Sequence, residues 1–169
     1  KTHVPCDSRY VGILAELARD YNVPMLMHFQ HEAFNTGFER FHTMLEKFPT
    51  VNFIGHAQAW WGNIDKNHVQ KVGYPTGKVT PGGITDRLLS DYPNIWGDLS
   101  AGSGNNAFLR DEEHARGFFA RHQDKLLFGT DCSSPCPLTQ RYVLPSLGLS
   151  VQLQSRAPVA LLMRQHFPS

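Results

Sequence analysis

The clearest pattern along the chain is a series of short apolar runs, each separated from the next by a helix-length stretch. The runs cover residues 24–29, 51–56, 94–100 and 125–128. They show little alternation of apolar and polar residues, which is typical of strands buried on both faces of a parallel sheet. Because each run follows a stretch with helical periodicity, the pattern predicts repeating helix–strand units and an α/β fold with parallel strands.

Apolar residues spaced three and four apart predict the helices between these runs. The first helix follows a cap at Asp7 or Ser8, and its apolar stripe consists of Ile13, Leu14, Leu17, Ala18 and Tyr21. The second has a largely aromatic face made of Phe38, Phe41, Leu45 and Phe48. Further helices are predicted at 85–91 and 111–123, with a Gly-rich loop, AGSGNN, between them.

The character of the chain changes near its C-terminal end. From Cys132 onward there is no Asp or Glu, although Arg141, Arg156 and Arg164 are present. We therefore divide the chain into an α/β domain at 1–136 and a tail at 137–169. A helix is predicted in the tail at about 158–166, whereas the pattern at 143–155 predicts no particular element.

The composition is typical of a soluble globular protein, and it narrows the classes of partner that we expect. It has 169 residues, 41% of them hydrophobic, and a formal net charge of +1. This charge gives no electrostatic reason to expect nucleic acid or a charged membrane as a partner. No signal-peptide pattern opens the chain, and its three cysteines suggest no disulfide framework, so we expect a cytoplasmic protein.

Three of the predicted strands end in a residue that can bind metal. His28 and His56 lie at the ends of the runs at 24–29 and 51–56, and Asp131 follows the run at 125–128. The carboxyl ends of parallel strands meet at one edge of a sheet, where ligands gather. Imidazole and carboxylate are the usual ligands of a catalytic divalent metal. A capping role for Asp131 and structural roles for the histidines remain the alternatives.

Two further groups near these strand ends have open interpretations. Trp60 and Trp61 follow His56 closely, and they either line a substrate pocket or anchor the core. Cys132 and Cys136 flank the segment after Asp131, where a thiolate nucleophile is conceivable, although free cysteines mostly behave as small hydrophobes.

Taken together, four segments resemble the amidohydrolase superfamily, in particular its amidohydrolase-2, decarboxylase-like branch. They are PMLMHFQ, FPTVNFIGHAQAWW, YPNIWGDLSAGSG and DKLLFGTDCSSP. The resemblance implies a (β/α)8 TIM barrel, of which this chain corresponds to the C-terminal half. It also implies that His28, His56 and Asp131 bind a divalent metal, most simply zinc, and that His56 and Asp131 act as acid–base groups.

The function implied is metal-dependent hydrolysis of an ester, lactone or amide, or decarboxylation of an aromatic acid. The His-x-His metal-binding pair of that family is not found in this sequence. A second hypothesis is therefore a non-catalytic half-barrel that binds a partner or forms a homo-oligomer. A third is a hydrolase that uses Cys132 or a nearby serine, although no G-x-S-x-G motif is present.

Overall fold

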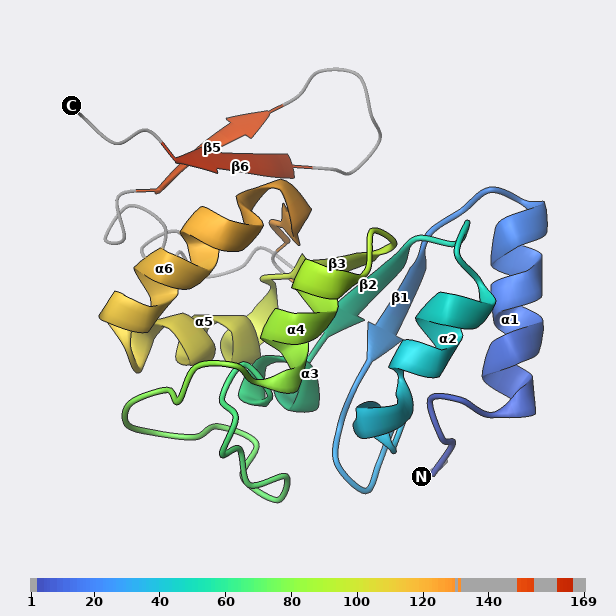
Figure 1. The fold of residues 1–169 in the computed structure, drawn as a ribbon, viewed down its shortest axis with the longest axis horizontal. Helices are drawn as coiled ribbons and strands as arrows, with labels where there is room; N and C mark the ends of the chain where they lie inside the picture. Colours follow the sequence, from blue (N-terminus) through green and yellow to red (C-terminus); the bar gives the residue numbers. More distant parts are fainter. Residues whose placement is uncertain (1–2, 130, 132–148, 154–160, 166–169) are drawn as a thin grey trace.

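The fold is an α/β arrangement built on one sheet, seen here in a computed structural model that describes residues 3–129, 131, 149–153 and 161–165. Figure 1 shows helix α1 at the β1 end of the sheet and helix α6 towards the β4 end. The elements in chain order are α1 (Arg9–Asp20), β1 (Met25–His28), η1 (Phe38–Arg40), α2 (His42–Lys47), β2 (Phe53–His56), α3 (Gln58–Gly62), α4 (Ile84–Asp91), β3 (Ile95–Asp98), α5 (Ala101–Leu109), α6 (Glu112–His122), η2 (Gln123–Lys125), β4 (Leu126–Leu127), β5 (Leu149–Leu153) and β6 (Leu161–Gln165).

The four predicted strands form a parallel sheet, which confirms the predicted helix–strand alternation. Their order in the sheet is β1, β2, β3, β4, and all three pairings are parallel. In the first pairing His28 lies opposite His56. Because all four strands run in the same direction, their carboxyl ends lie along one edge of the sheet.

One face of this sheet is packed against helices by aromatic side chains. Phe53 on β2 meets the ring of Phe41 edge-on, with 5.5 Å between centroids. The indole of Trp60 lies directly over Gly55, where an added Cβ would come within 2.2 Å of the ring. On the opposite face Leu26 is 57% exposed, so this side of the sheet is less fully covered.

The structure corrects the predicted helix at 158–166. Residues Leu161–Gln165 form strand β6, which pairs antiparallel with β4 and with β5. A strand here satisfies the backbone groups along the β4 edge, which a helix would leave unpaired. Within the described part of the chain the sheet therefore has six strands, in the order β1-β2-β3-β4-β6-β5.

The Gly-rich segment AGSGNN is also different from its prediction, because it begins helix α5 rather than a loop. Gly104 explains part of this composition. A Cβ at this position would lie 2.6 Å from the carbonyl oxygen of Leu99, so only glycine allows the first turn to pack so closely. Ala107 and Phe108, further along the same helix, are buried in the core.

Helix α1 begins at the predicted cap, but its packing face is not the predicted one. Ser8 accepts a hydrogen bond from the backbone N–H of Val11. The side that packs on the rest of the protein is made of small residues: Val11, Gly12, Ala15 and Ala18. Most of the predicted stripe is instead exposed, namely Ile13 (42%), Leu14 (54%), Leu17 (48%) and Tyr21 (75%). The expected self-association remains a prediction, and this apolar surface is the feature that favours it.

In the part of the chain that the structure describes, no helix has the length and apolar character needed to cross a bilayer.

Candidate functional site

Four polar residues gather where the parallel strands end. His28 and His56 are the last residues of β1 and β2, and Asp98 is the last residue of β3. Asp131 follows β4 by a few residues. The three residues predicted from the sequence are therefore brought to one edge, and Asp98 joins them.

His56 is the most constrained of these side chains. It is 5% exposed, and its Nδ1 lies 3.0 Å from Oδ2 of Asp98. On the other side of the ring, Nε2 lies 3.9 Å from Oδ2 of Asp131. The imidazole thus lies between two carboxylates, with one nitrogen directed into the protein and the other towards the strand ends.

Asp98 is a buried carboxylate with hydrogen-bond donors around it. Its Oδ1 accepts from the backbone N–H of Ser100 at 3.1 Å, and its Oδ2 accepts from the Ser100 hydroxyl as well as facing His56. Burial would raise the pKa of Asp98, but the hydrogen bonds from His56 and Ser100 outweigh this effect and hold the pKa below its usual value. Asp98 is therefore ionised at neutral pH.

His28 lies beside His56 and is held by the loop that follows β1. The two imidazole centroids are 5.2 Å apart. Nε2 of His28 lies 3.4 Å from Oε1 of Gln30, and the ring of Phe34 meets the imidazole edge-on. Burial is the main cause that lowers the pKa of His28, so the ring is neutral at pH 7, the form in which imidazole binds metal.

Asp131 is the accessible member of the group, with its side chain 58% exposed. Its φ of 54° lies in the left-handed region, which aspartate and asparagine tolerate better than most residues. Its neighbours Cys132 and Cys136 lie outside the described residues. Cys6 is buried, and burial raises the pKa of its thiol to about 12, so this cysteine is not a nucleophile.

The imidazole nitrogens of His28 and His56 and the carboxylate of Asp131 are suitable ligands for a divalent metal, although they do not surround one common point. Two donors bound to a tetrahedral zinc at ~2 Å lie about 3.3 Å apart, so the 3.9 Å between Nε2 of His56 and Oδ2 of Asp131 is longer than in a closed zinc site. The carboxylate behind His56 is the partner that metal-binding histidines usually have. Within the described residues, however, no three His, Cys, Asp or Glu side chains are placed so that they could hold one ion.

The structure shows Trp60 and Trp61 as residues of the hydrophobic core rather than as the lining of a substrate pocket. Their exposed fractions are 0% and 1%, so neither ring can line a pocket for substrate. They still support the site, because the indole N–H of Trp61 donates to the backbone carbonyl of Asp98 at 2.8 Å. A substituent on Gly97 would come within 3.1 Å of the Trp61 ring, which explains the glycine before Asp98.

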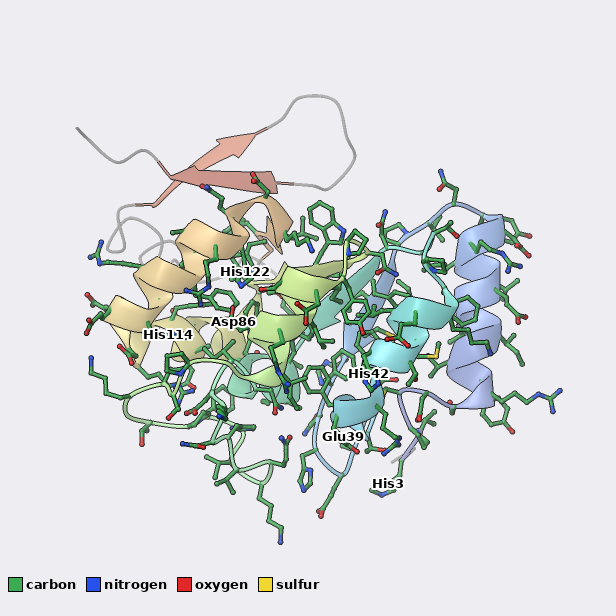
Figure 2. The ribbon with its side chains drawn as sticks, in the orientation of Figure 1. His3, Glu39, His42, Asp86, His114 and His122 are labelled. Atoms are coloured by element: carbon green, nitrogen blue, oxygen red, sulfur yellow. The ribbon has the colours of Figure 1, made fainter. Side chains whose placement is uncertain are left out.

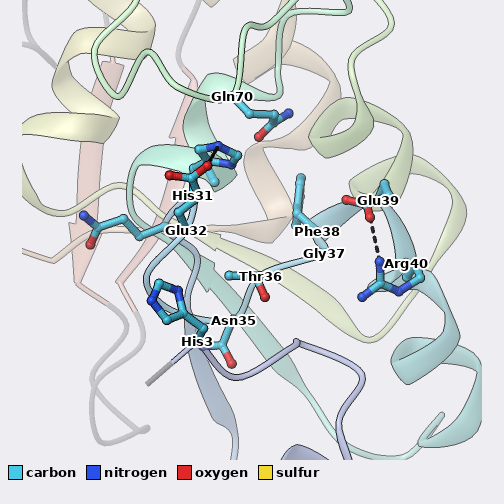
Figure 3. A pocket seen from close by; sticks show the side chains of 12 residues that line it. His3, His31, Glu32, Asn35, Thr36, Gly37, Phe38, Glu39, Arg40 and Gln70 are labelled. Atoms are coloured by element: carbon cyan, nitrogen blue, oxygen red, sulfur yellow. Dashed lines mark hydrogen bonds and ion pairs between the residues drawn. The ribbon is translucent and has the colours of Figure 1, made fainter. Parts of the chain in front are cut away.

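Two pockets lie at the loop that follows β1. A pocket of about 460 Å³ is lined by this loop, by η1 and by the N-terminal segment. Figure 3 shows His31 and Glu32 on one side of this pocket and the ion pair of Glu39 with Arg40 on the other. A second pocket, of about 510 Å³, shares Gln30 with the first. Gln30 also contacts His28, but neither pocket is lined by His28, His56, Asp98 or Asp131 themselves.

A second buried Asp–His pair lies between α4 and α6 (Figure 2). Asp86 Oδ1 lies 2.5 Å from Nε2 of His122, and its Oδ2 accepts from Arg121 at 2.9 Å. Burial would raise the pKa of Asp86, but the contacts with His122 and Arg121 outweigh it and lower the pKa. This pair ties two helices together, which is a structural role.

Sequence reasoning missed Asp98 and Ser100, although a signal was present. The segments FIGH and IWGD share one pattern: two apolar residues, a glycine and then a polar residue at the strand end. Since Gly55 and Gly97 both lie under tryptophan rings, the shared pattern reflects shared packing. Comparing the two strands position by position would have aligned Asp98 with His56.

Comparisons of the chain with protein-family models, with curated proteins and with solved structures give no match. The case for a function therefore rests on the residues and geometry at the strand ends.

Proposed function

We propose that the chain is a metal-dependent hydrolase of the amidohydrolase-2 type, acting on an ester, lactone or amide, or decarboxylating an aromatic acid. In this proposal the four parallel strands form half of a TIM-type barrel. The observation that carries it is the meeting of His28, His56 and Asp131 at one edge of the sheet, with 3.9 Å between His56 and Asp131. Their donor atoms, two imidazoles and a carboxylate, are those of catalytic zinc sites.

In this proposal the three residues bind the metal, and Asp131 and His56 also act on protons. His28, His56 and Asp131 would hold the metal ion, and a bound zinc would lower the pKa of water towards ~7 and polarise a carbonyl group. Asp131 is exposed, and the oxygen of its carboxylate that does not bind the metal would accept the proton that leaves the attacking water. Where Nε2 of His56 does not bind the metal, it would take up a proton and pass it to the departing group of the substrate, so the two roles are alternatives at this nitrogen. Burial of His56 keeps its ring in one orientation for this transfer.

The proposal is tested with a panel of aryl esters, lactones and aryl carboxylic acids. We expect turnover of at least one class by the purified chain, its loss after treatment with a chelator, and its return when zinc is added. Turnover that is unaffected by the chelator would contradict a metal-dependent reaction.

A second candidate function is association without catalysis, as a half-barrel that binds a partner or a second copy of itself. The exposed apolar residues of α1, among them Leu14 and Leu17, favour it. No turnover on the panel, no bound zinc and a stable dimer in light scattering would together support this function over the first.

A further inference from the structure

The carboxylate of Asp98 has donors on both of its oxygens. The backbone N–H of Ser100 donates to Oδ1 at 3.1 Å, and the hydroxyl of Ser100 donates to Oδ2. Asp98 is 9% exposed, and no proton is needed on the carboxylate to satisfy these contacts. It is therefore an acceptor towards its remaining neighbour, Nδ1 of His56, at 3.0 Å.

Nδ1 of His56 faces Asp98 and also lies 3.3 Å from the hydroxyl oxygen of Ser100, whose hydrogen is donated to Asp98. Both neighbours of Nδ1 are therefore acceptors, and they decide which nitrogen of His56 carries the hydrogen. With Nδ1–H donating to Asp98, Nε2 keeps its lone pair. Nε2 is also the nitrogen that faces Asp131. A neutral imidazole in this tautomer can bind a metal ion or take a proton only on the side where the proposed site lies.

The surroundings of Asp98 leave it little freedom to move. The indole N–H of Trp61 donates to its carbonyl oxygen at 2.8 Å. Gly129, on the neighbouring chain segment after β4, packs so closely that an added Cβ would lie 3.1 Å from Oδ1 of Asp98 and 3.2 Å from Cβ of Ser100. Asp98 is thus held through its backbone by α3, and through its carboxylate by the N-cap residue of α5 and the segment after β4.

We propose that Asp98, together with Ser100, is a positioning pair that fixes His56 as the Nδ1–H tautomer and aims its Nε2 at the metal and substrate. The part of this proposal that concerns metal and substrate rests on the proposed function. The tautomer itself depends only on the contacts around His56. Replacing the hydrogen-bond partner of a metal-binding histidine typically weakens metal affinity by 10–100-fold.

The chain provides a matched control in its second Asp–His pair. Asp86 is as buried as Asp98, at 8% exposed, and also faces a histidine nitrogen. Asp86→Asn makes the same chemical change in a pair that joins two helices. It should lower stability without altering His56, which separates a specific effect from a general loss of packing.

The test is the ¹⁵N spectrum of the histidine rings in the uniformly labelled full chain, combined with zinc titration. We expect His56 to be Nδ1–H in the wild type and to change towards Nε2–H in Asp98→Asn, because the asparagine amide can donate to Nδ1. Zinc affinity should fall 10–100-fold, and turnover by up to about 10⁴-fold, the size of effect that a wrong tautomer causes in a Ser-His-Asp triad. Ser100→Ala, which keeps the carboxylate, should give a smaller change in the same direction, and Asp86→Asn should give none.

An Nε2–H tautomer in the wild type would overturn the proposal and requires no variant to observe. An unchanged tautomer in folded Asp98→Asn would also overturn it. If the tautomer depends on Asp98 but the wild type binds no zinc, the proposed metal-dependent function fails while the positioning of His56 by Asp98 stands.

Discussion

Asp131→Asn is expected to remove nearly all turnover while leaving the fold intact. Asparagine has the size of aspartate but cannot take a proton from water, and it is a weaker metal ligand. Loss of a general base commonly reduces the rate by 10²–10⁴-fold, and loss of the metal reduces it further. The φ of 54° at this position suits asparagine, and the side chain is mostly exposed, so the free energy of unfolding should change little.

The measurement is turnover of the variant on the substrate panel, with circular dichroism to confirm the fold. Cys132→Ala is the comparison variant and should stay within a few fold of the wild type, because a thiol has no role in the metal reaction. The thiol hypothesis would replace the metal one if Asp131→Asn were fully active and Cys132→Ala inactive.

Trp60→Ala is expected to have the largest effect on stability. The ring is fully buried and lies among the rings of Phe29, Phe38 and Trp61, with centroid distances of 5.7–6.2 Å. Replacing a buried tryptophan with alanine typically costs about 3–5 kcal/mol, a large share of the 5–15 kcal/mol that stabilises a domain. His56 should also lose its fixed place, since Trp60 packs on the glycine that precedes it.

Urea unfolding measures this effect as a lower midpoint. Tyr10→Ala is the matched control, because Tyr10 is 73% exposed and its loss should change stability by no more than about 0.5 kcal/mol. If Trp60→Ala kept its stability and only raised KM, the ring would be part of a substrate pocket after all.

The sequence predicted the parallel strands and the polar residues at or just beyond the ends of β1, β2 and β4, because apolar runs separated by helix-length stretches indicate buried parallel strands. It also predicted the aromatic face of Phe38, Phe41, Leu45 and Phe48, all of which are buried. Helix α1 shows why the rest was harder. Periodicity identifies residues that share a face, but it does not say which face packs, and close packing on Gly12 and Ala15 turned the larger residues outwards.

The role of Asp98 was hidden for a different reason. Its segment was interpreted as a plain strand, and only the pairing of β2 with β3 brings the carboxylate to His56. The strand at Leu161–Gln165 is likewise defined by its partner, because its hydrogen bonds are made with β4 and β5 rather than within its own sequence. Contacts between distant segments decide both features, and the pattern within one segment does not contain them.

The most direct test of the account is a zinc titration of the metal-free chain by isothermal calorimetry, with His28→Ala and His56→Ala titrated in parallel. The account predicts one zinc ion per chain in the wild type and greatly weakened binding in each variant, because each removes one of three ligands. His122→Ala, which removes a histidine from the structural pair with Asp86, should keep the site. A wild-type chain that binds no zinc, or that binds it equally well without His28 and His56, would contradict the account.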